Sequence, residues 1–185
     1  MPCWNEEAER IMTERFGKDT VIALATTADL VPYVRYVNAY YENGCFYTIT
    51  YAHSNKMKHI EKNPVVAIAG DWFTAHGKGV SLGFFGREEN AQIAEKLRKA
   101  FAAWIGNGHN DFEDKNTIIL CVELTDGVLL SHGTRYAFQM MDGQPGTAES
   151  ISDTHQAGKH GEEDVKRAQS LAVSTFVVRF ERRAV

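Results

Sequence analysis

The chain has 185 residues, of which 44% are hydrophobic and 24% charged, and these values suit one soluble globular domain with a small appendage. Its net charge of −4 and sequence pI of about 6.0 argue against the concentrated basic surface of a general nucleic-acid binder. No apolar run approaches the length that a membrane-spanning helix needs, so no membrane association is expected.

The N-terminus and the cysteines indicate a cytoplasmic protein. The segment MPCWNEEAERIMTERFGKD carries acidic residues where a secretory signal has a basic start and an apolar core. Cys3, Cys45 and Cys121 are widely spaced and form no CxxC pair. Reduced thiols are therefore expected, and a zinc site has little support.

The first part of the chain predicts a helix followed by three antiparallel strands. Apolar residues recur at helical spacing over 5–16, and Gly17 is a plausible helix stop. Strands are expected at 20–27, 33–41 and 45–51, joined by a turn within 28–32 and by a tight hairpin at 42–44.

The second part predicts two helices among further strands. The expected elements are a short helix at 56–63 that ends before Pro64, a strand at 65–73, a turn at 74–79, a strand at 80–86, a helix at 88–104, and strands at 116–124 and 127–131 separated by a turn or bulge at 125–127. Six or seven short strands with few helices predict a mainly β protein, a small antiparallel barrel. A parallel α/β sheet would need a helix after nearly every strand.

The corner between residues 51 and 56 is a candidate phosphate site. A helix N-terminus offers unpaired N–H groups and partial positive charge, Ser54 fits the N-cap position, and Lys56 adds a full charge. Arg35 is expected opposite residues close to Tyr51, so that it points at the same place. The alternative is that Ser54 is only a cap, Lys56 a solvated lysine, and Arg35 an outward-facing strand residue.

The order ALATT, PYVRYV, FYT and SNKMKHIEKNPVVA resembles the pyridoxamine 5′-phosphate oxidase-like, FMN-binding split-barrel family over residues 20 to about 133. The resemblance implies a split antiparallel β-barrel and a homodimer with FMN in clefts between the subunits. The FMN-binding residues that it implies are Arg35, Ser54, Asn55 and Lys56 at the phosphate, Tyr36, Val37 and Asn38 along the ring, Tyr47 and Thr48 on the adjacent strand, and Lys78 and Gly79 from the second subunit.

The chain also departs from this family's namesake oxidases. Tyr40 stands where they carry a basic residue on the substrate side, and Asn55 replaces an arginine that is often found there. The C-terminal segment lacks their tryptophan-, arginine- and glycine-rich motif. Pyridoxal phosphate synthesis is therefore not expected, and the chain looks more like the stress-related and nitroimidazole-reductase-like branch.

We expect three parts of the chain, divided by a change of composition at residue 142, and an oxidoreductase function. Residues 1–141 would form the FMN-binding barrel, 142–161 a polar loop, and 162–185 a helix and strand docked on the barrel or on the dimer partner. The expected activity is reduction of a small molecule with NAD(P)H or another donor, the flavin carrying the redox chemistry.

The residues do not force a general acid or base. His132 and Tyr136 are the first candidates for an acid or base. The alternatives are that His132 is a hydrogen-bonded histidine at a strand end and that Tyr136 fills the end of the barrel. His53 could add a donor to the phosphate or lie in an exposed loop. His109 and Asp111 have a spacing that could hold a metal, but a polar loop is the expected structure there and no metal site is predicted.

Three rival functions fit the same fold. A non-catalytic flavin carrier or haem-handling protein would need an axial ligand in an apolar cleft if it held haem. A deazaflavin-dependent reductase would need more basic groups than Arg35 and Lys56 provide. In a structural dimer with a vestigial pocket, replacing Arg35 and Lys56 would leave the FMN affinity unchanged.

Overall fold

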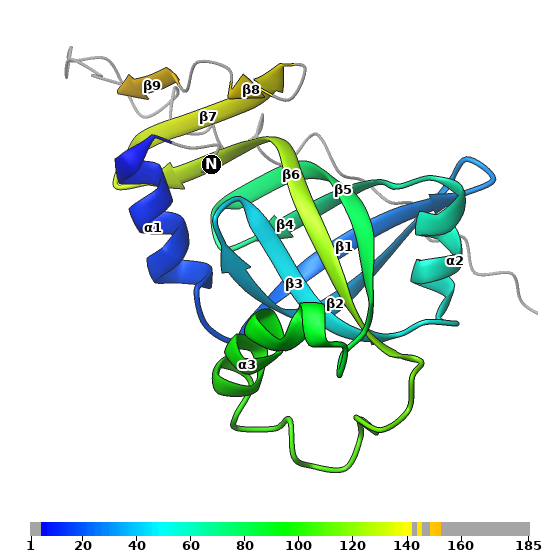
Figure 1. The fold of residues 1–185 in the computed structure, drawn as a ribbon. Coiled ribbons are helices and arrows are strands. Elements are labelled where there is room, and N and C mark those ends of the chain that lie inside the picture. The colour runs from blue at the N-terminus through cyan, green and yellow to red at the C-terminus, as the bar shows by residue number, and fades with distance from the viewer. Residues whose placement is uncertain (1–4, 142–143, 146–148, 153–185) are drawn as a thin grey trace, which may run out of the picture. The chain divides into compact units, whose positions relative to one another are not determined.

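The computed structural model describes residues 5–141, 144–145 and 149–152 (Figure 1). The elements are α1 (Glu6–Phe16), β1 (Thr20–Ala28), β2 (Val31–Glu42), β3 (Cys45–Tyr51), α2 (Asn55–Lys62), β4 (Val65–Gly70), β5 (Phe73–Phe84), the 3-10 turn η1 (Glu88–Asn90), α3 (Ala91–Ala100), β6 (Thr117–Ser131), β7 (Thr134–Met141), β8 (Gln144–Pro145) and β9 (Glu149–Ser152).

Strands β1 to β6 close into an antiparallel barrel. The order β3-β2-β1-β4-β5-β6 is completed by pairing of β3 with β6, so each of these strands has two neighbours. The second half of β6 also pairs with β7, which in turn pairs with β8 and β9. The prediction of a mainly β, antiparallel barrel is confirmed, as are the three strands that follow α1 in antiparallel succession.

Alternating apolar side chains fill the barrel, and α1 and α2 close off its core. Ile22, Leu24, Phe46, Ile68 and Leu120 are buried inside. Both helices add buried side chains to the same cluster, with Phe16 from α1 and Met57 and Ile60 from α2. Figure 1 shows α1 and α2 on opposite sides of the barrel. Burial of this apolar surface is the main force that holds the fold together.

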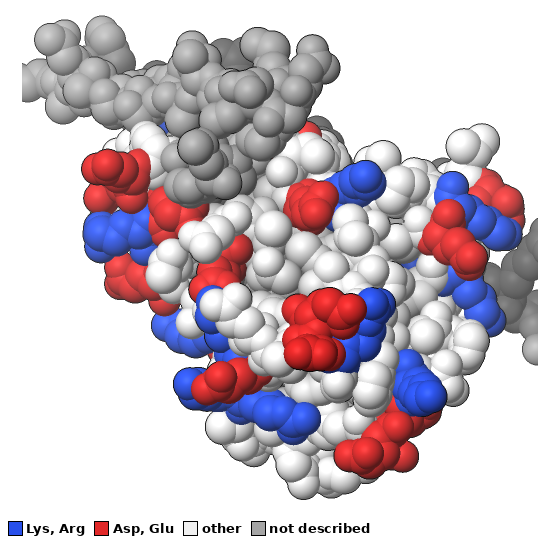
Figure 2. Space-filling view, in the orientation of Figure 1, with Lys and Arg blue, Asp and Glu red and all other residues white. Residues whose placement is uncertain are grey.

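The sequence encodes the limits and the outer face of α1. The side chain of Asn5 caps the helix by accepting a 2.8 Å hydrogen bond from the Ala8 amide, and Gly17 follows the last turn. Arg10 lies between Glu7 and Glu14 on the solvent side and forms ion pairs with both. Charges of both signs are accordingly mixed on this helix in Figure 2.

Helix α3 covers part of the outside of the barrel and forms a second apolar cluster there. Leu97 and Phe101 pack with Ile119 of β6, and Tyr47 and Ile49 of β3 lie against them. A charge-assisted contact fixes the helix to the end of β2, because Lys96 Nζ donates to both Glu42 carboxylate oxygens at 2.6 and 2.7 Å.

The outer faces of β2, β1 and β4 carry alanines bordered by larger apolar residues, and we call this surface the alanine face. Ala23 lies between Tyr36 and Ala69, and Ala25 lies between Val34 and Ala67. Tyr36 and Val34 are 80% and 68% exposed. No described element covers this face, which is the kind of apolar surface that marks an interaction site.

The predicted turn at 74–79 is wrong. The chain reverses at Asp71–Trp72, where Trp72 has a φ of 51°, and β5 then continues unbroken from Phe73 to Phe84. Its glycines serve strand packing, since a Cβ on Gly77 would lie 2.7 Å from the Glu123 carbonyl oxygen. Pairing with β4 and β6 on both sides overrides the local turn signal.

The other differences concern boundaries and the later strands. Residues 125–127 form a bulge, the second of the two predicted alternatives, because His76 pairs with Asp126 while Gly77 pairs with Leu124. Strand β7 was not expected from the sequence, nor were β8 and β9 within the expected loop 142–161. The rest of that loop, and the helix and strand expected at 162–185, lie outside the described residues. None of the helices in the described ranges is long and apolar enough to cross a membrane.

Gly79 allows α2 to lie close to β5. A Cβ at this position would meet three side-chain atoms of Ile60 at 3.0 to 3.2 Å. The amide of Gly79 also donates to the Pro64 carbonyl oxygen at 2.8 Å, and the Asn63 side chain donates to Thr27 Oγ1 at 2.9 Å. These contacts fix the position of α2, and with it the corner where the helix begins.

We expect Gly79→Ala to lower the free energy of unfolding by about 1–3 kcal/mol relative to Gly106→Ala, because the added methyl overpacks the core against Ile60. Gly106 is the matched control, since a Cβ there meets nothing within 4 Å. Urea denaturation measures both variants. Equal stabilities would show that α2 does not depend on the missing side chain.

Candidate functional site

Strands β2 and β3 separate at one end of the barrel. Their ladder runs only from Glu42–Cys45 to Tyr40–Tyr47. Beyond it, residues 31–39 of β2 pair with β1, while β3 pairs with β6. The outer edge of β2 therefore has no strand beside it among the described residues. The expected placement of Arg35 opposite residues near Tyr51 is wrong, because the two strands have already parted; Arg35 lies opposite Leu24 of β1 instead.

Arg35 is held at this opening by a small polar network. It shares the inward face of β2 with Val37 and is half-buried. Its Nη1 donates to the Leu24 carbonyl oxygen at 3.1 Å and to Thr26 Oγ1 at 2.8 Å. Thr26 Oγ1 in turn lies 3.0 Å from His59 Nδ1 of α2, so the hydroxyl can accept from Arg35 while donating to the ring. The guanidinium is thus oriented by residues of β1 and α2.

Lys56, in the first turn of α2, brings a second positive charge to Arg35. Burial lowers the pKa of Lys56, and the nearby Arg35 charge lowers it further. Burial also lowers the pKa of Arg35. Neither cation has a carboxylate within ion-pair distance in the described part of the chain. Two half-buried like charges without a counterion are costly, and an anion between them would remove that cost.

Ser54 supplies an unused hydroxyl at the same corner. Its backbone has N-cap geometry, with φ −65° and ψ 154°, but its side chain makes no capping hydrogen bond. The Oγ is buried and has no hydrogen-bond partner among the described residues. Buried hydroxyls nearly always have a hydrogen-bond partner, so an unpaired one needs an explanation. A bound ligand atom would provide the partner. The arrangement fits a phosphate, which brings the acceptor oxygens and the negative charge that these groups lack.

Other residues expected at the cofactor have different positions. Asn55 begins α2 and is exposed, and His53 is exposed beside the ring of Tyr51, 5.6 Å between centroids. Tyr36 points outward onto the alanine face, whereas Val37 packs against the core. Asn38 also faces outward.

The side chains of Asn38, Tyr47 and Thr48 are used within the fold. Asn38 Nδ2 donates to Asp19 Oδ1 at 2.8 Å, and the other oxygen of Asp19 accepts from the Trp104 indole at 2.6 Å. Tyr47 lies beneath α3, and Thr48 is buried on the opposite, inward face of β3. Their side chains are therefore not gathered with Arg35 and Lys56.

Lys78 and Gly79 lie together on β5. Lys78 is exposed, between Val65 of β4 and Glu123 of β6 in the sheet register. Gly79 is buried against α2, as described above. The predicted site therefore divides into a convergent corner of Arg35, Ser54 and Lys56 and a set of residues that this single chain does not bring to it.

The candidate acids and bases lie in loops and at the β6–β7 end. His132 occupies the β6–β7 turn, with its Nδ1 3.0 Å from Ser131 Oγ, which matches the alternative of a satisfied histidine. Tyr136 is on β7, packed against the core cluster. His109 and Asp111 belong to the loop after α3, where Asp111 Oδ1 accepts from the Glu113 amide at 2.9 Å.

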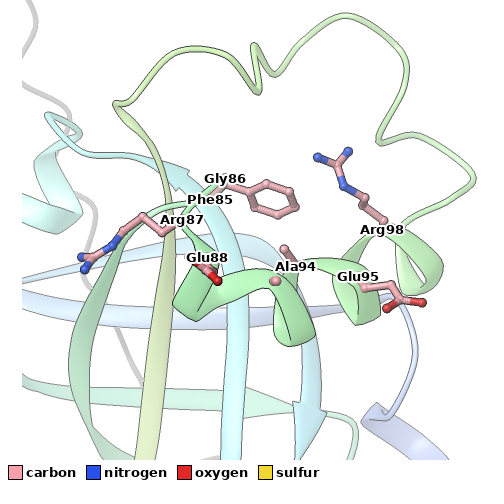
Figure 3. A pocket seen from close by; sticks show the side chains of 8 residues that line it. Phe85, Gly86, Arg87, Glu88, Ala94, Glu95 and Arg98 are labelled. Atoms are coloured by element: carbon pink, nitrogen blue, oxygen red, sulfur yellow. The ribbon is translucent and has the colours of Figure 1, made fainter.

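A separate hollow of about 350 Å³ lies beside α3. Figure 3 shows Phe85 and Arg98 on one side of the helix and Arg87 pointing away from them. The Arg98 guanidinium stacks over the rings of Phe85 and Phe112, at 4.8 and 4.9 Å from their centroids. This arginine is engaged in holding the loop after α3, and the hollow is not part of the corner at α2.

Thr26 and His59 are site residues that sequence reasoning missed. Thr26 interrupts an apolar run at an inward position, and His59 follows Lys56 by three residues and so lies on the same helix face. Both signals are weak alone, because a threonine in a strand and a histidine in a helix are common. Only the pairing of β1 with β2 brings them together at Arg35.

Comparison with known proteins identifies relatives of this chain. The model of a family described as pyridoxamine 5′-phosphate oxidase matches residues 9–128. No curated protein matches the sequence.

Several solved structures have a similar fold. A pyridoxamine 5′-phosphate oxidase-related, FMN-binding protein from Nostoc punctiforme is 18% identical with a TM-score of 0.52, over 79% of this chain and 95% of that one. General stress protein 26 from Bacillus anthracis is 16% identical with a TM-score of 0.51, over 79% of this chain and 98% of that one. An FAD-binding protein from Mesorhizobium loti is 13% identical with a TM-score of 0.51, over 64% and 90%. At these identities the similarity concerns the fold alone, and it agrees with a split barrel.

We expect Lys56→Met to stabilise the ligand-free protein at neutral pH, because the charged lysine is disfavoured by burial and by Arg35. A lowered pKa means that the folded protein binds fewer protons than the unfolded one, so wild-type stability rises with pH between the two pKa values. The advantage of the variant should therefore shrink as the pH approaches the ordinary lysine pKa. Urea denaturation in a buffer without phosphate measures the difference.

Lys58→Met is the control for this experiment, since Lys58 is an exposed lysine on the same helix. A Lys56→Met protein no more stable than the control would contradict the idea of two opposed charges at the corner. A difference that stayed constant with pH would contradict the assignment to the Lys56 ammonium.

Proposed function

Because the chain belongs to the pyridoxamine 5′-phosphate oxidase family, we propose that it binds flavin mononucleotide (FMN) and acts as an FMN-dependent oxidoreductase on a small molecule. The observation that carries the proposal is the pair of half-buried cations, Arg35 and Lys56, without an acidic partner in the described residues. The Nostoc punctiforme relative is described as FMN-binding, which supports the choice of cofactor.

The corner matches the chemistry of a phosphate ester. A phosphate monoester carries a charge of about −1.5 to −2 at neutral pH and three acceptor oxygens. Arg35 and Lys56 would supply the opposite charges, and the Ser54 hydroxyl would gain the hydrogen bond that it lacks. The first amides of α2 would also donate to the phosphate, since the N-terminal N–H groups of a helix have no partner within it.

The open edge of β2 would position the ring. Tyr36, Val37 and Asn38 lie along the edge that β3 leaves uncovered, where the backbone groups of alternate residues can bond a planar heterocycle. Bound FMN would supply hydride and electron transfer, with NAD(P)H or another donor, while these residues bind and orient it. Lys78 would approach from a second subunit.

The substrate is proposed to differ from that of the namesake oxidases. Tyr40, which replaces their basic residue, packs in the cluster under α3, near the carboxylate of Glu42. Burial is the main reason why its pKa is raised, so it stays neutral. A neutral phenol in this position provides no charge for a second phosphate ester.

The alanine face supports a homodimer. Alanine side chains in the middle of the face allow a second sheet to approach closely, and Val34 and Tyr36 are exposed apolar groups at its border. The face lies on β2, the strand that also carries Arg35, so a second subunit packed there would adjoin the corner. An arrangement of this kind would bring Lys78 of the partner subunit to the flavin.

We expect Arg35→Ala together with Lys56→Ala to weaken FMN binding at least about a hundredfold, since each charge-assisted phosphate contact contributes about 1.5–3 kcal/mol. Quenching of flavin fluorescence on titration measures the dissociation constant. Lys58→Ala together with Lys62→Ala is the matched control, because it removes two charges from exposed positions of the same helix.

Unchanged FMN affinity in the Arg35 and Lys56 double variant would overturn the site. The spectrum of the purified protein tests the cofactor itself: absorbance near about 450 nm indicates flavin, and an intense Soret band indicates haem. Mass spectrometry of the released ligand identifies the flavin, and anaerobic titration with NADH and NADPH tests the electron donor.

We expect Ala25→Glu to convert the dimer to monomers, because it places an unpaired charge at the centre of the alanine face. A buried, unpaired charge costs about 3–5 kcal/mol, so the dimer dissociation constant should rise at least about a hundredfold. Sedimentation velocity measures it, with Gln92→Glu on the exposed side of α3 as the control. A dimer that tolerates the change would place the interface elsewhere.

A further inference from the structure

His59 of α2 lies beside the anion corner and contacts two strands of the barrel. Its Nδ1 is 3.0 Å from Thr26 Oγ1 of β1, and its ring packs against the ring of Tyr33 of β2, with 4.8 Å between the centroids. The buried Thr26 hydroxyl also accepts from Arg35 Nη1 at 2.8 Å. The imidazole is therefore within about 6 Å of the guanidinium, a distance at which charges in a protein interact appreciably.

The Thr26 hydroxyl can bond to His59 in either of its charge states. A hydroxyl has one hydrogen and two acceptor lone pairs. While Arg35 donates to one lone pair, a neutral His59 ring can accept the hydroxyl hydrogen at Nδ1, and a protonated ring can donate from Nδ1 to the second lone pair. Protonation of His59 therefore reverses one hydrogen bond and keeps the link between Arg35 and the ring.

The charges around His59 are mainly positive. Arg35 is joined to the ring through Thr26. Within α2, Lys56 and Lys62 are three positions away from His59 on either side, on the same face of the helix. Like charges disfavour the protonated form of an imidazole. Without an anion, these cations therefore oppose a positive charge on His59.

No acidic side chain among the described residues forms an ion pair with His59. Glu61 lies two positions further along α2 and so does not face the ring. The two strands of the barrel that pack most against α2 also lack acids, since β1 contains no titratable residue and β5 contains only His76 and Lys78. The negative charge that would favour a protonated His59 has to come from a ligand.

We propose that His59 is a third cationic group of the anion corner and takes up a proton from solvent when a dianion binds beside Arg35 and Lys56, an inference that rests on the proposed phosphate site. The dianion offsets the repulsion that opposes protonation, and the protonated ring in turn attracts the dianion. The two events are linked, so each favours the other to the same extent. Because the bound protein holds more protons than the free protein, affinity for the anion rises as the pH falls through the range in which histidine titrates, about pH 5 to 8.

The experiment compares sulfate binding by the full-length wild-type protein and by His59→Asn at about pH 7.5 and about pH 5.5. Sulfate keeps two negative charges at both pH values, whereas a phosphate ester gains a proton near about pH 6, so a pH dependence measured with sulfate belongs to the protein. An NMR titration that follows the backbone amides of α2 gives the dissociation constant. The asparagine side-chain oxygen can accept from Thr26 as Nδ1 does, but asparagine does not titrate.

We expect the wild-type protein to bind sulfate at least about fivefold more tightly at the lower pH. His59→Asn should match the wild-type affinity within about twofold at the higher pH and lack the gain at the lower pH. His53→Asn is the matched control, since His53 is an exposed histidine directly before Ser54, and it should keep the gain. A purely structural role of His59 would instead change the affinity by the same factor at both pH values.

Calorimetry of the wild-type protein measures the proton itself and does not depend on how well a variant folds. Sulfate binding near about pH 6.5, repeated in two buffers of different ionisation enthalpy, should show uptake of part of a proton. Sulfate binding without proton uptake, or an equal pH dependence in wild type and in folded His59→Asn, would overturn the role of His59 and leave the phosphate site standing. A wild-type protein that binds neither sulfate nor FMN would overturn the phosphate site, and the role of His59 with it.

Discussion

The separation of β2 from β3 is the constraint on which the rest of the site depends. β2 pairs with β1 along residues 31–39, and β3 pairs with β6 along its whole length, so the two strands share hydrogen bonds only near their hairpin. This split leaves one edge of β2 open and lets the chain turn from β3 into α2. Arg35 and the first turn of α2 then face one another across the opening. A barrel with β2 and β3 paired throughout would have closed this corner.

The corner is a place where the fold accepts an electrostatic cost. Arg35 and Lys56 are both removed in part from water, and each opposes the charge of the other. Hydrogen bonds to Leu24 and Thr26 orient the guanidinium but bring no negative charge. Ser54 adds a buried hydroxyl that no described residue hydrogen-bonds. Unfavourable charges and an unpaired hydroxyl at one place are typical of a binding site that a ligand completes.

Sequence patterns predicted most of the elements and the proximity of Arg35 and Lys56, but not the way the corner is assembled. Helical spacing located α1, and the Asn43–Gly44 turn located the β2–β3 hairpin, because these signals are local. The turn expected at 74–79 was wrong because glycines in β5 serve close packing of strands rather than chain reversal. The network of Thr26 and His59 depends on pairing between distant segments, which a one-dimensional pattern does not contain. The placement of Tyr47 beneath α3 was hidden for the same reason.

The contact between Gly79 and Ile60 sets the position of α2, and so the width of the corner between α2 and Arg35. Ser54 and Lys56 move with α2, whereas Arg35 is tied to the barrel wall through β1. The distance between the two halves of the corner therefore depends on Gly79, which lacks the side chain that other residues would place against α2. A bulkier residue at position 79 would require α2 to lie farther from β5, and Ser54 and Lys56 would move with the helix. Gly79 can in this way influence the size of the binding site without touching the bound anion.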